Sequence, residues 1–151
     1  MSKTHTYPIN VAWSGGRDGS GTVNSPTNGA SVTLAVGPEY GGSGGASNPE
    51  ELLTAAVASC YSMTFGIIAA NRKLPVAGLS VEAVGEVEEN GPSFTFKKIT
   101  IKPTINVSPE ASDQQIQAIT DSAHKADAYC IITNAVRGRV EIVVEPQIVG
   151  R

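Results

Sequence analysis

Two cysteines are the residues of this chain best suited to chemistry. Cys60 stands among small residues in the stretch Ala55–Ser62, and Cys130 lies far along the chain from it. A thiolate is a strong nucleophile and is readily oxidised. In a reducing compartment, two distant cysteines are more often catalytic or inert than joined by a structural disulfide. The pair is therefore a candidate redox couple, and the alternative is two buried cysteines that only fill the core.

A thiolate in the middle of a helix needs a cation from elsewhere, because the helix dipole acts only near the helix ends. Arg17, in a turn rich in glycine, is our candidate for this cation, with a solvated turn residue as the alternative. Glu50 and Glu51 occupy a predicted helix start, where carboxylates interact favourably with the dipole. That structural role accounts fully for Glu51 and leaves Glu50 as a candidate partner of the arginine.

Several classes of function are not supported by the sequence. His5 and His124 have no metal-ligand spacing with each other or with the cysteines, so we expect no metal site. No Cys-x-x-Cys motif, phosphate-binding loop or Gly-x-Ser-x-Gly elbow is present. The net charge is −3 and the basic residues are scattered, which argues against nucleic acid as a partner. The first residues lack the apolar core of a signal peptide, which predicts a cytoplasmic protein.

A long helix should carry Cys60. Asn48-Pro49-Glu50-Glu51 combines an N-cap, a proline at the first position and an acidic third position, and the helix should run to about Asn71. The span Leu52–Ala70 is uncharged and about as long as a bilayer-spanning helix. Because small residues dominate it, we expect a helix buried on all sides inside the protein and no membrane span.

The remaining patterns predict strands and one more helix in a single α+β domain over residues 1–151. The expected strands are Tyr7–Trp13, a short one around Thr22–Val23, Ser31–Val36, Leu79–Glu88, Ile99–Val107 and Arg139–Glu145. The first three should form an antiparallel set, and the fourth and fifth a long hairpin. Ser108-Pro109-Glu110 predicts the start of the second helix.

Three motifs together carry a family resemblance. They are Gly15-Gly16-Arg17-Asp18-Gly19, then Asn48-Pro49-Glu50-Glu51-Leu52 followed by Cys60, and last the run from Cys130 to Arg137-Gly138. Each is weak alone, but their order and spacing resemble the OsmC/Ohr family over nearly the whole chain. The arginine in the glycine turn and the Asn-Ala-x-Arg-Gly run are more similar to the Ohr branch, whose members are organic hydroperoxide reductases.

The resemblance implies a mechanism and a fold. Cys60 would be the peroxidatic cysteine and Cys130 the resolving one, with Arg17 and Glu50 activating and orienting. An organic hydroperoxide would be the substrate, no cofactor would be needed, and an external dithiol, with lipoyl groups as the family's suggestion, would regenerate the thiols. The implied fold has antiparallel sheets around a long central helix, in an intertwined homodimer. Apolar residues should line an acyl-shaped access path for the peroxide: Tyr61, Phe65 and Ile68.

One departure and two alternatives accompany this interpretation. Ile131 stands where the family usually has proline, which would help to fix the first turn of a helix. The resemblance therefore supports the role of Cys130 less directly than that of Cys60. A non-catalytic ligand-binding protein of the same fold is one alternative, and a hydrolase or transferase with Cys60 as acyl nucleophile is another. The latter lacks a histidine placed as general base.

Helix geometry independently predicts a homodimer with composite sites. Glu50 and Cys60 are separated by roughly 15 Å along a straight helix at about 1.5 Å per residue. They cannot share one site within a chain. If Glu50 holds the arginine that activates Cys60, it must come from a second copy in a two-fold arrangement.

Overall fold

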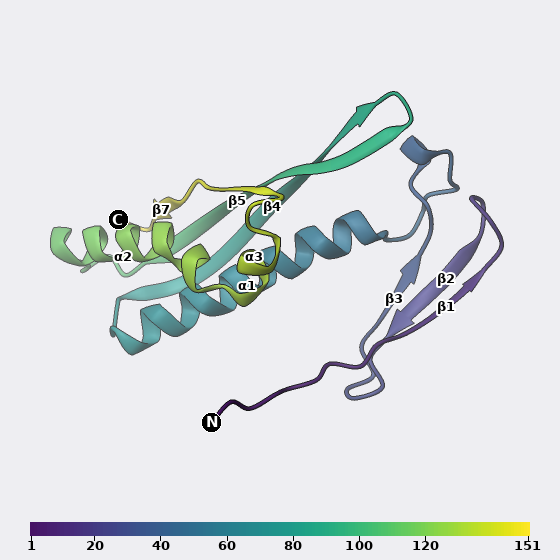
Figure 1. The fold of residues 1–151 in the computed structure, drawn as a ribbon. Coiled ribbons are helices and arrows are strands. Elements are labelled where there is room, and N and C mark those ends of the chain that lie inside the picture. Colours follow the sequence, from purple (N-terminus) through teal and green to yellow (C-terminus); the bar gives the residue numbers. More distant parts are fainter. The chain divides into compact units, whose positions relative to one another are not determined.

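The computed structural model describes residues 1–151 as an α+β chain of two compact units, residues 1–52 and 53–151 (Figure 1). The strands are β1 (Asn10–Ser14), β2 (Ser20–Asn24), β3 (Ser31–Leu34), β4 (Val76–Asn90), β5 (Ser93–Val107), β6 (Glu141–Val144) and β7 (Gln147–Val149). The helices are α1 (Pro49–Asn71), α2 (Asp113–Lys125) and α3 (Ile131–Val136), with short 3₁₀ turns η1 (Pro38–Tyr40) and η2 (Ala126–Tyr129).

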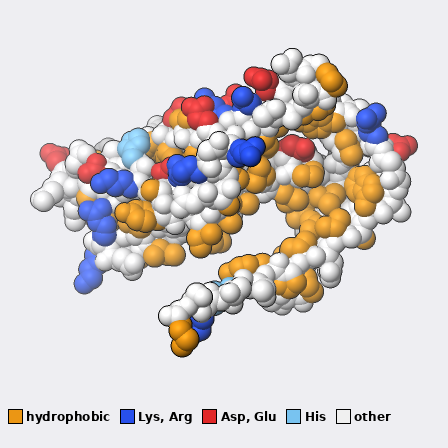
Figure 2. Space-filling view, viewed as in Figure 1, with side chains coloured by type: hydrophobic (Ala, Val, Ile, Leu, Met, Phe, Trp, Pro, Cys, Tyr) orange, Lys and Arg blue, Asp and Glu red, His pale blue; other side chains and the backbone are white.

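The first unit is a three-stranded antiparallel sheet in the order β1-β2-β3. The predicted antiparallel set is confirmed, although β1 begins three residues later than Tyr7, at Asn10. Its side chains find little cover, since Val11 is 62% exposed and Trp13 is 43% exposed. Ala35 is the only buried hydrophobic residue of this unit, and Figure 2 shows hydrophobic side chains on its surface. The sheet therefore has no core of its own.

The second unit is built on the predicted hairpin. β4 and β5 pair antiparallel from Asn90↔Ser93 to Val76↔Val107. β6 and β7 both run parallel to β5, so this sheet is mixed, whereas only antiparallel sheets were expected. The reason is the connection, because the chain crosses through α2, η2 and α3 before it returns to the sheet.

Helix α1 buries one stripe of side chains at intervals of four residues. The stripe is Val57, Tyr61, Phe65 and Ala69. The opposite face is open, with Met63 69% and Ile67 61% exposed. Within residues 53–151 no element covers this second face, so the expected burial on all sides is not met in this unit. By length and composition α1 could cross a membrane, a property that core helices of soluble proteins share.

Helix α2 begins later than predicted. Ser112 is its N-cap and forms a reciprocal capping box with Gln115, at 3.1 Å and 2.9 Å. The expected start at Ser108 is instead a turn closed by the N–H of Ala111. A helix start at Ser112 is favoured over one at Ser108 because the Ser112–Gln115 pair satisfies two backbone donors at once. Ala111, just before the cap, is buried.

One core joins the elements of the second unit. Ile99, Ile101 and Ile105 of β5 are fully buried and pack with α1 and α2. The predicted strand Ile99–Val107 is thus confirmed as the second part of β5. At Gly85 of β4 an added Cβ would collide with Thr54 Oγ1 of α1, so glycine lets the helix approach the hairpin closely.

Candidate thiol site

The structure brings the two cysteines together from distant elements. Cys60 lies in the middle of α1, and Cys130 is the N-cap of α3. Both are free thiols that hydrogen-bond to each other. Their exposure differs, because Cys60 is partly exposed whereas Cys130 is fully buried. An incoming molecule therefore meets Cys60 first.

The surroundings of Cys60 favour its anionic form. Burial is the largest single influence and raises the pKa of Cys60. It is outweighed by hydrogen bonds from the Cys130 side chain, the Thr64 side chain and the backbone at Ile132 and Ile131, so the pKa of Cys60 ends below its ordinary value. All of these groups lie in residues 53–151.

The surroundings of Cys130 have the opposite effect and favour its neutral form. Burial and the hydrogen bond with Cys60 raise the pKa of Cys130, while Thr133 lowers it in part. Its Sγ accepts a hydrogen bond from the Thr133 N–H at 3.3 Å, as an N-cap side chain does. Next to a thiolate at Cys60, Cys130 is therefore held as a neutral thiol that can act as a hydrogen-bond donor.

A polar clamp holds the segment around Cys130. The Arg137 guanidinium donates to Asn134 Oδ1 at 3.1 Å and to the Asp127 carbonyl at 3.2 Å, with an ion pair to the Asp127 carboxylate at 3.4 Å. Asn134 Nδ2 donates to the Ala128 carbonyl at 3.1 Å. The Asn134-to-Arg137 run thus ties α3 to η2, on either side of Cys130. In the sequence this run was recognisable only as a mark of family resemblance.

Two further threonines were missed as site residues. Thr64 is four residues after Cys60 on α1, and Thr133 is three residues after Cys130 at the start of α3. The spacings were available signals, because residues four apart share a helix face and the third residue of a helix donates to the N-cap. Neither could be assigned until both cysteines were known to lie on helices.

Arg17 lies in the first unit, in a turn at the end of β1. Gly15 adopts a φ of +93°, and the N–H of Gly19 bonds the Gly16 carbonyl at 3.0 Å. The stem of Arg17 passes close to Gly41, where an added Cβ would lie 2.9 Å from Arg17 Cδ. The local turn was predicted correctly, and the action of Arg17 on Cys60 stays a prediction.

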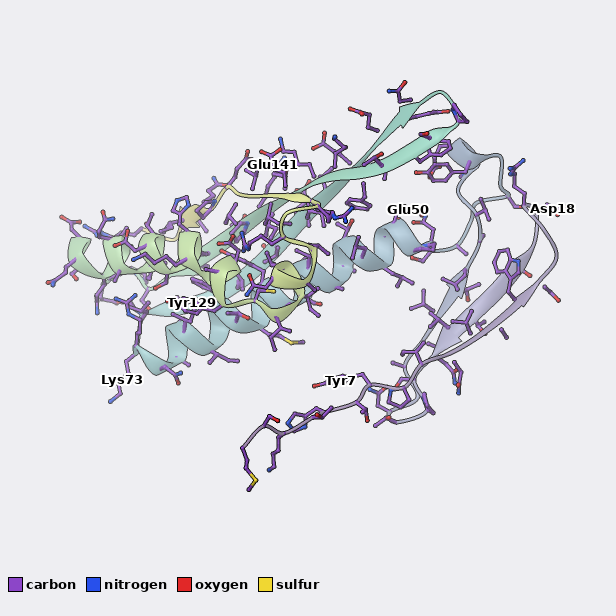
Figure 3. All side chains as sticks on the ribbon, in the orientation of Figure 1. Tyr7, Asp18, Glu50, Lys73, Tyr129 and Glu141 are labelled. Carbon is purple, nitrogen blue, oxygen red and sulfur yellow. The ribbon has the colours of Figure 1, made fainter.

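The two glutamates lie at the first turn of α1. Asn48 Oδ1 accepts a hydrogen bond from the Glu51 N–H at 2.8 Å, and Glu51 Oε1 accepts one from Ser47 Oγ at 3.0 Å. The prediction that Asn48 caps α1 is therefore confirmed, and Glu51 has the structural role expected of a carboxylate at a helix start. Figure 3 shows Glu50 at the N-terminal end of α1 and Lys73 just beyond the other end. The role of Glu50 toward the arginine stays a prediction.

The residues expected along a peroxide path occupy the core in this chain. Tyr61 and Phe65 are fully buried with stacked rings 6.5 Å apart, and Tyr61 donates to the Ala123 carbonyl of α2 at 2.6 Å. Burial and the charge of Asp127 raise the pKa of Tyr61, so it stays a neutral donor. Ile68 packs against the same core. Their lining of a substrate path stays a prediction.

The vicinity of the thiols also carries exposed apolar side chains. Ile131, next to Cys130, is 79% exposed, and Tyr129, labelled in Figure 3, is 68% exposed. Despite the absence of proline at position 131, α3 begins directly after Cys130. No group of three or more His, Cys, Asp or Glu side chains in the chain could hold a metal ion.

Comparison with known proteins places this geometry in a family. The model of a family described as OsmC-like protein matches residues 42–145. The uncharacterized protein YmaD of Bacillus subtilis is 28% identical over 95% of each chain. Organic hydroperoxide resistance protein-like 2 of Staphylococcus epidermidis is 30% identical over 92% of this chain and 94% of its own. An OsmC-like protein of unknown function from Vibrio cholerae shares the fold, with a TM-score of 0.80 at 22% identity, over 95% of this chain and 100% of its own.

Proposed function

Since the chain belongs to the OsmC-like protein family, we propose that it is a thiol peroxidase that reduces organic hydroperoxides, with Cys60 as peroxidatic and Cys130 as resolving cysteine. One observation carries the proposal: a partly exposed thiol of lowered pKa hydrogen-bonds to a second, buried thiol. A relative named for organic hydroperoxide resistance supports the substrate class. The whole of residues 1–151 would act as one domain.

The chemistry proceeds in two balanced steps. The Cys60 thiolate attacks the distal oxygen of the peroxide, the O–O bond breaks, and the alcohol leaves after taking up a proton, which yields a sulfenic acid. The Cys130 sulfur then attacks the Cys60 sulfur, water leaves, and a disulfide forms. The chain's contribution is to hold Cys60 as a thiolate and to keep Cys130 beside it.

Reduction returns the enzyme to its starting state. A dithiol exchanges with the disulfide and leaves as its own cyclic disulfide, with lipoyl groups as the physiological candidate. No resident cofactor takes part in either half of the cycle. Such a cycle suits a cytoplasmic, stress-responsive enzyme, because the cytoplasm supplies reduced dithiols.

Arg17 and Glu50 complete the proposed site. Arg17 would hold the peroxide and further stabilise the thiolate, and Glu50 would fix the guanidinium by a charge-assisted fork. Because Glu50 is about 15 Å along α1 from Cys60, it would come from a second copy of the chain. The exposed face of α1, with Met63 and Ile67, supplies apolar surface for such a homodimer.

Steady-state turnover of cumene hydroperoxide with dihydrolipoamide tests the proposal. Wild type should turn over rapidly, and Cys60→Ser should lose at least about a thousandfold in rate, as removal of a nucleophile does. Cys130→Ser should consume roughly one equivalent of peroxide and then stall. Ser59→Ala, beside Cys60 but with its hydroxyl bonded to the Ala56 carbonyl, is the matched control and should retain activity. Absence of turnover in wild type would favour the non-catalytic binding protein.

A further inference from the structure

Thr133 carries an anomaly in the core. Its side chain is fully buried, and its Oγ1 is the only buried side-chain oxygen or nitrogen in the chain without a hydrogen-bond partner. Buried hydroxyls are almost always paired, so an orphan suggests a partner that appears only in another state of the molecule. The function proposed above does not use this hydroxyl.

The neighbour of this hydroxyl is the sulfur of Cys130. The backbone N–H of Thr133 already donates to Cys130 Sγ at 3.3 Å. The Thr133 hydroxyl also interacts with the Cys130 side chain as a hydrogen-bond donor would, which lowers the pKa of Cys130 against the stronger effects of burial and Cys60. A hydroxyl that lies beside this sulfur, makes no hydrogen bond of good geometry in the reduced protein and favours the anion is placed to donate once the sulfur is charged.

The proposed cycle contains one step in which Cys130 becomes an anion. In the oxidised protein the Cys60 sulfur is the more accessible one, because Cys130 is fully buried. A thiolate of the reductant therefore attacks the Cys60 sulfur and forms a mixed disulfide. The Cys60–Cys130 bond breaks, and Cys130 leaves with the electron pair. The second thiolate of the dithiol then releases Cys60 and closes the oxidised reductant, while Cys130 takes up a proton.

We propose that Thr133 is a catalytic residue of the reductive half-reaction, whose hydroxyl donates a hydrogen bond to the leaving Cys130 thiolate. The inference rests on the proposed disulfide cycle and extends it. A leaving thiolate departs faster when it is stabilised, and the Thr133 N–H and hydroxyl are in place to stabilise it. The attack of Cys60 on the peroxide comes before any step at Cys130, so the rate of peroxide consumption should not depend on this hydroxyl.

The test separates the two half-reactions in the full-length protein. Protein oxidised with diamide is mixed with dihydrolipoamide, and the reduction rate is followed. Thr133→Val, which keeps shape and removes the hydroxyl, should slow reduction by about tenfold or more. Thr133→Ser, which keeps the hydroxyl, should stay within about threefold of wild type. The rate of peroxide consumption in a single turnover should be unchanged in both variants.

Controls make the outcome decisive. Thr120→Val makes the same chemical change on α2, where the hydroxyl bonds the Ile116 carbonyl, and should leave reduction unaffected. Should Thr133→Val not fold, Thr133→Ala replaces it. Equal rates for wild type and the hydroxyl-free variant, or equal losses in Thr133→Ser and Thr133→Val, would overturn the inference. Because diamide makes the disulfide without peroxide, a protein that fails to reduce peroxides can still show the Thr133 effect, so the two failures are distinguishable.

Discussion

The two units of the chain differ in what holds them together. Residues 53–151 enclose a core in which Tyr61, Phe65 and Ile105 are fully buried. Residues 1–52 present Trp13 and Val11 to solvent and bury only one hydrophobic residue, Ala35. The thiol pair thus lies in the unit that has a core, whereas the arginine turn belongs to a sheet without one. The proposed oxidation chemistry and its proposed activation by Arg17 therefore come from separate units.

The largest expected effect is a loss of stability when the core of the second unit is disrupted. Phe65→Ala should lower the free energy of unfolding by about 3–5 kcal/mol, because it empties a fully buried ring site. Met63→Ala, on the open face of the same helix, should cost less than about 1 kcal/mol in a monomer. Denaturant unfolding over a range of protein concentrations measures both. A large, concentration-dependent loss for Met63→Ala would show that a second copy covers this face.

The next effect concerns the first unit. Arg17→Ala should lower kcat/KM for cumene hydroperoxide by about a hundredfold if, as proposed, its charge stabilises the reacting thiolate and holds the peroxide. Arg17→Lys should recover part of the rate. Arg139→Ala, another exposed arginine, should be neutral. An Arg17→Ala protein with wild-type kinetics would mean that the second unit is catalytically complete alone.

A smaller effect should come from Glu50. Glu50→Ala should cost about tenfold in kcat/KM, because its proposed role is only to orient the arginine. Mixed dimers of Cys60→Ser and Glu50→Ala subunits should recover one intact site if the two residues come from different chains. No recovery in verified heterodimers would reduce Glu50 to a carboxylate at the helix start.

The smallest effect is a shift on the pH axis. The lowered pKa of Cys60 places its thiolate fraction above that of a free thiol at any pH below the free-thiol value, so its alkylation should stay fast as the pH falls toward neutrality. Thr64→Val removes one of the hydrogen bonds that lower the pKa of Cys60. The midpoint of the alkylation rate against pH should therefore move to higher pH. Iodoacetamide rates resolved by peptide mass spectrometry measure this. A midpoint at the free-thiol value in wild type would contradict the assignment.

Local patterns in the sequence predicted most of the fold. The Asn48 cap, the strand over Ile99–Val107 and the long hairpin rest on short-range signals, and each appears as expected. The parallel placement of β6 and β7 was not predictable, because it depends on a crossover whose short helix α3 leaves no clear periodicity. The open face of α1 was mispredicted because a uniformly apolar composition does not say which side a single chain covers.

The sequence predicted the two cysteines of the site but not the groups that hydrogen-bond to them. Cys60 and Cys130 stood out by chemistry and resemblance. Two of the hydrogen bonds that lower the pKa of Cys60 come from the backbone of α3, at Ile132 and Ile131, and backbone donors leave no mark in residue identity. Thr133 was equally hidden, since its significance depends on burial and on a missing partner.

Peptide mapping after peroxide treatment tests the central claim most directly. Reduced protein is exposed to one equivalent of cumene hydroperoxide, free thiols are blocked, and the digest is analysed by mass spectrometry. The account predicts an intrachain Cys60–Cys130 disulfide as the main product, and a stable sulfenic acid at Cys60 in the Cys130→Ser variant. Overoxidised Cys60 with Cys130 still free, or two unmodified cysteines, would contradict it.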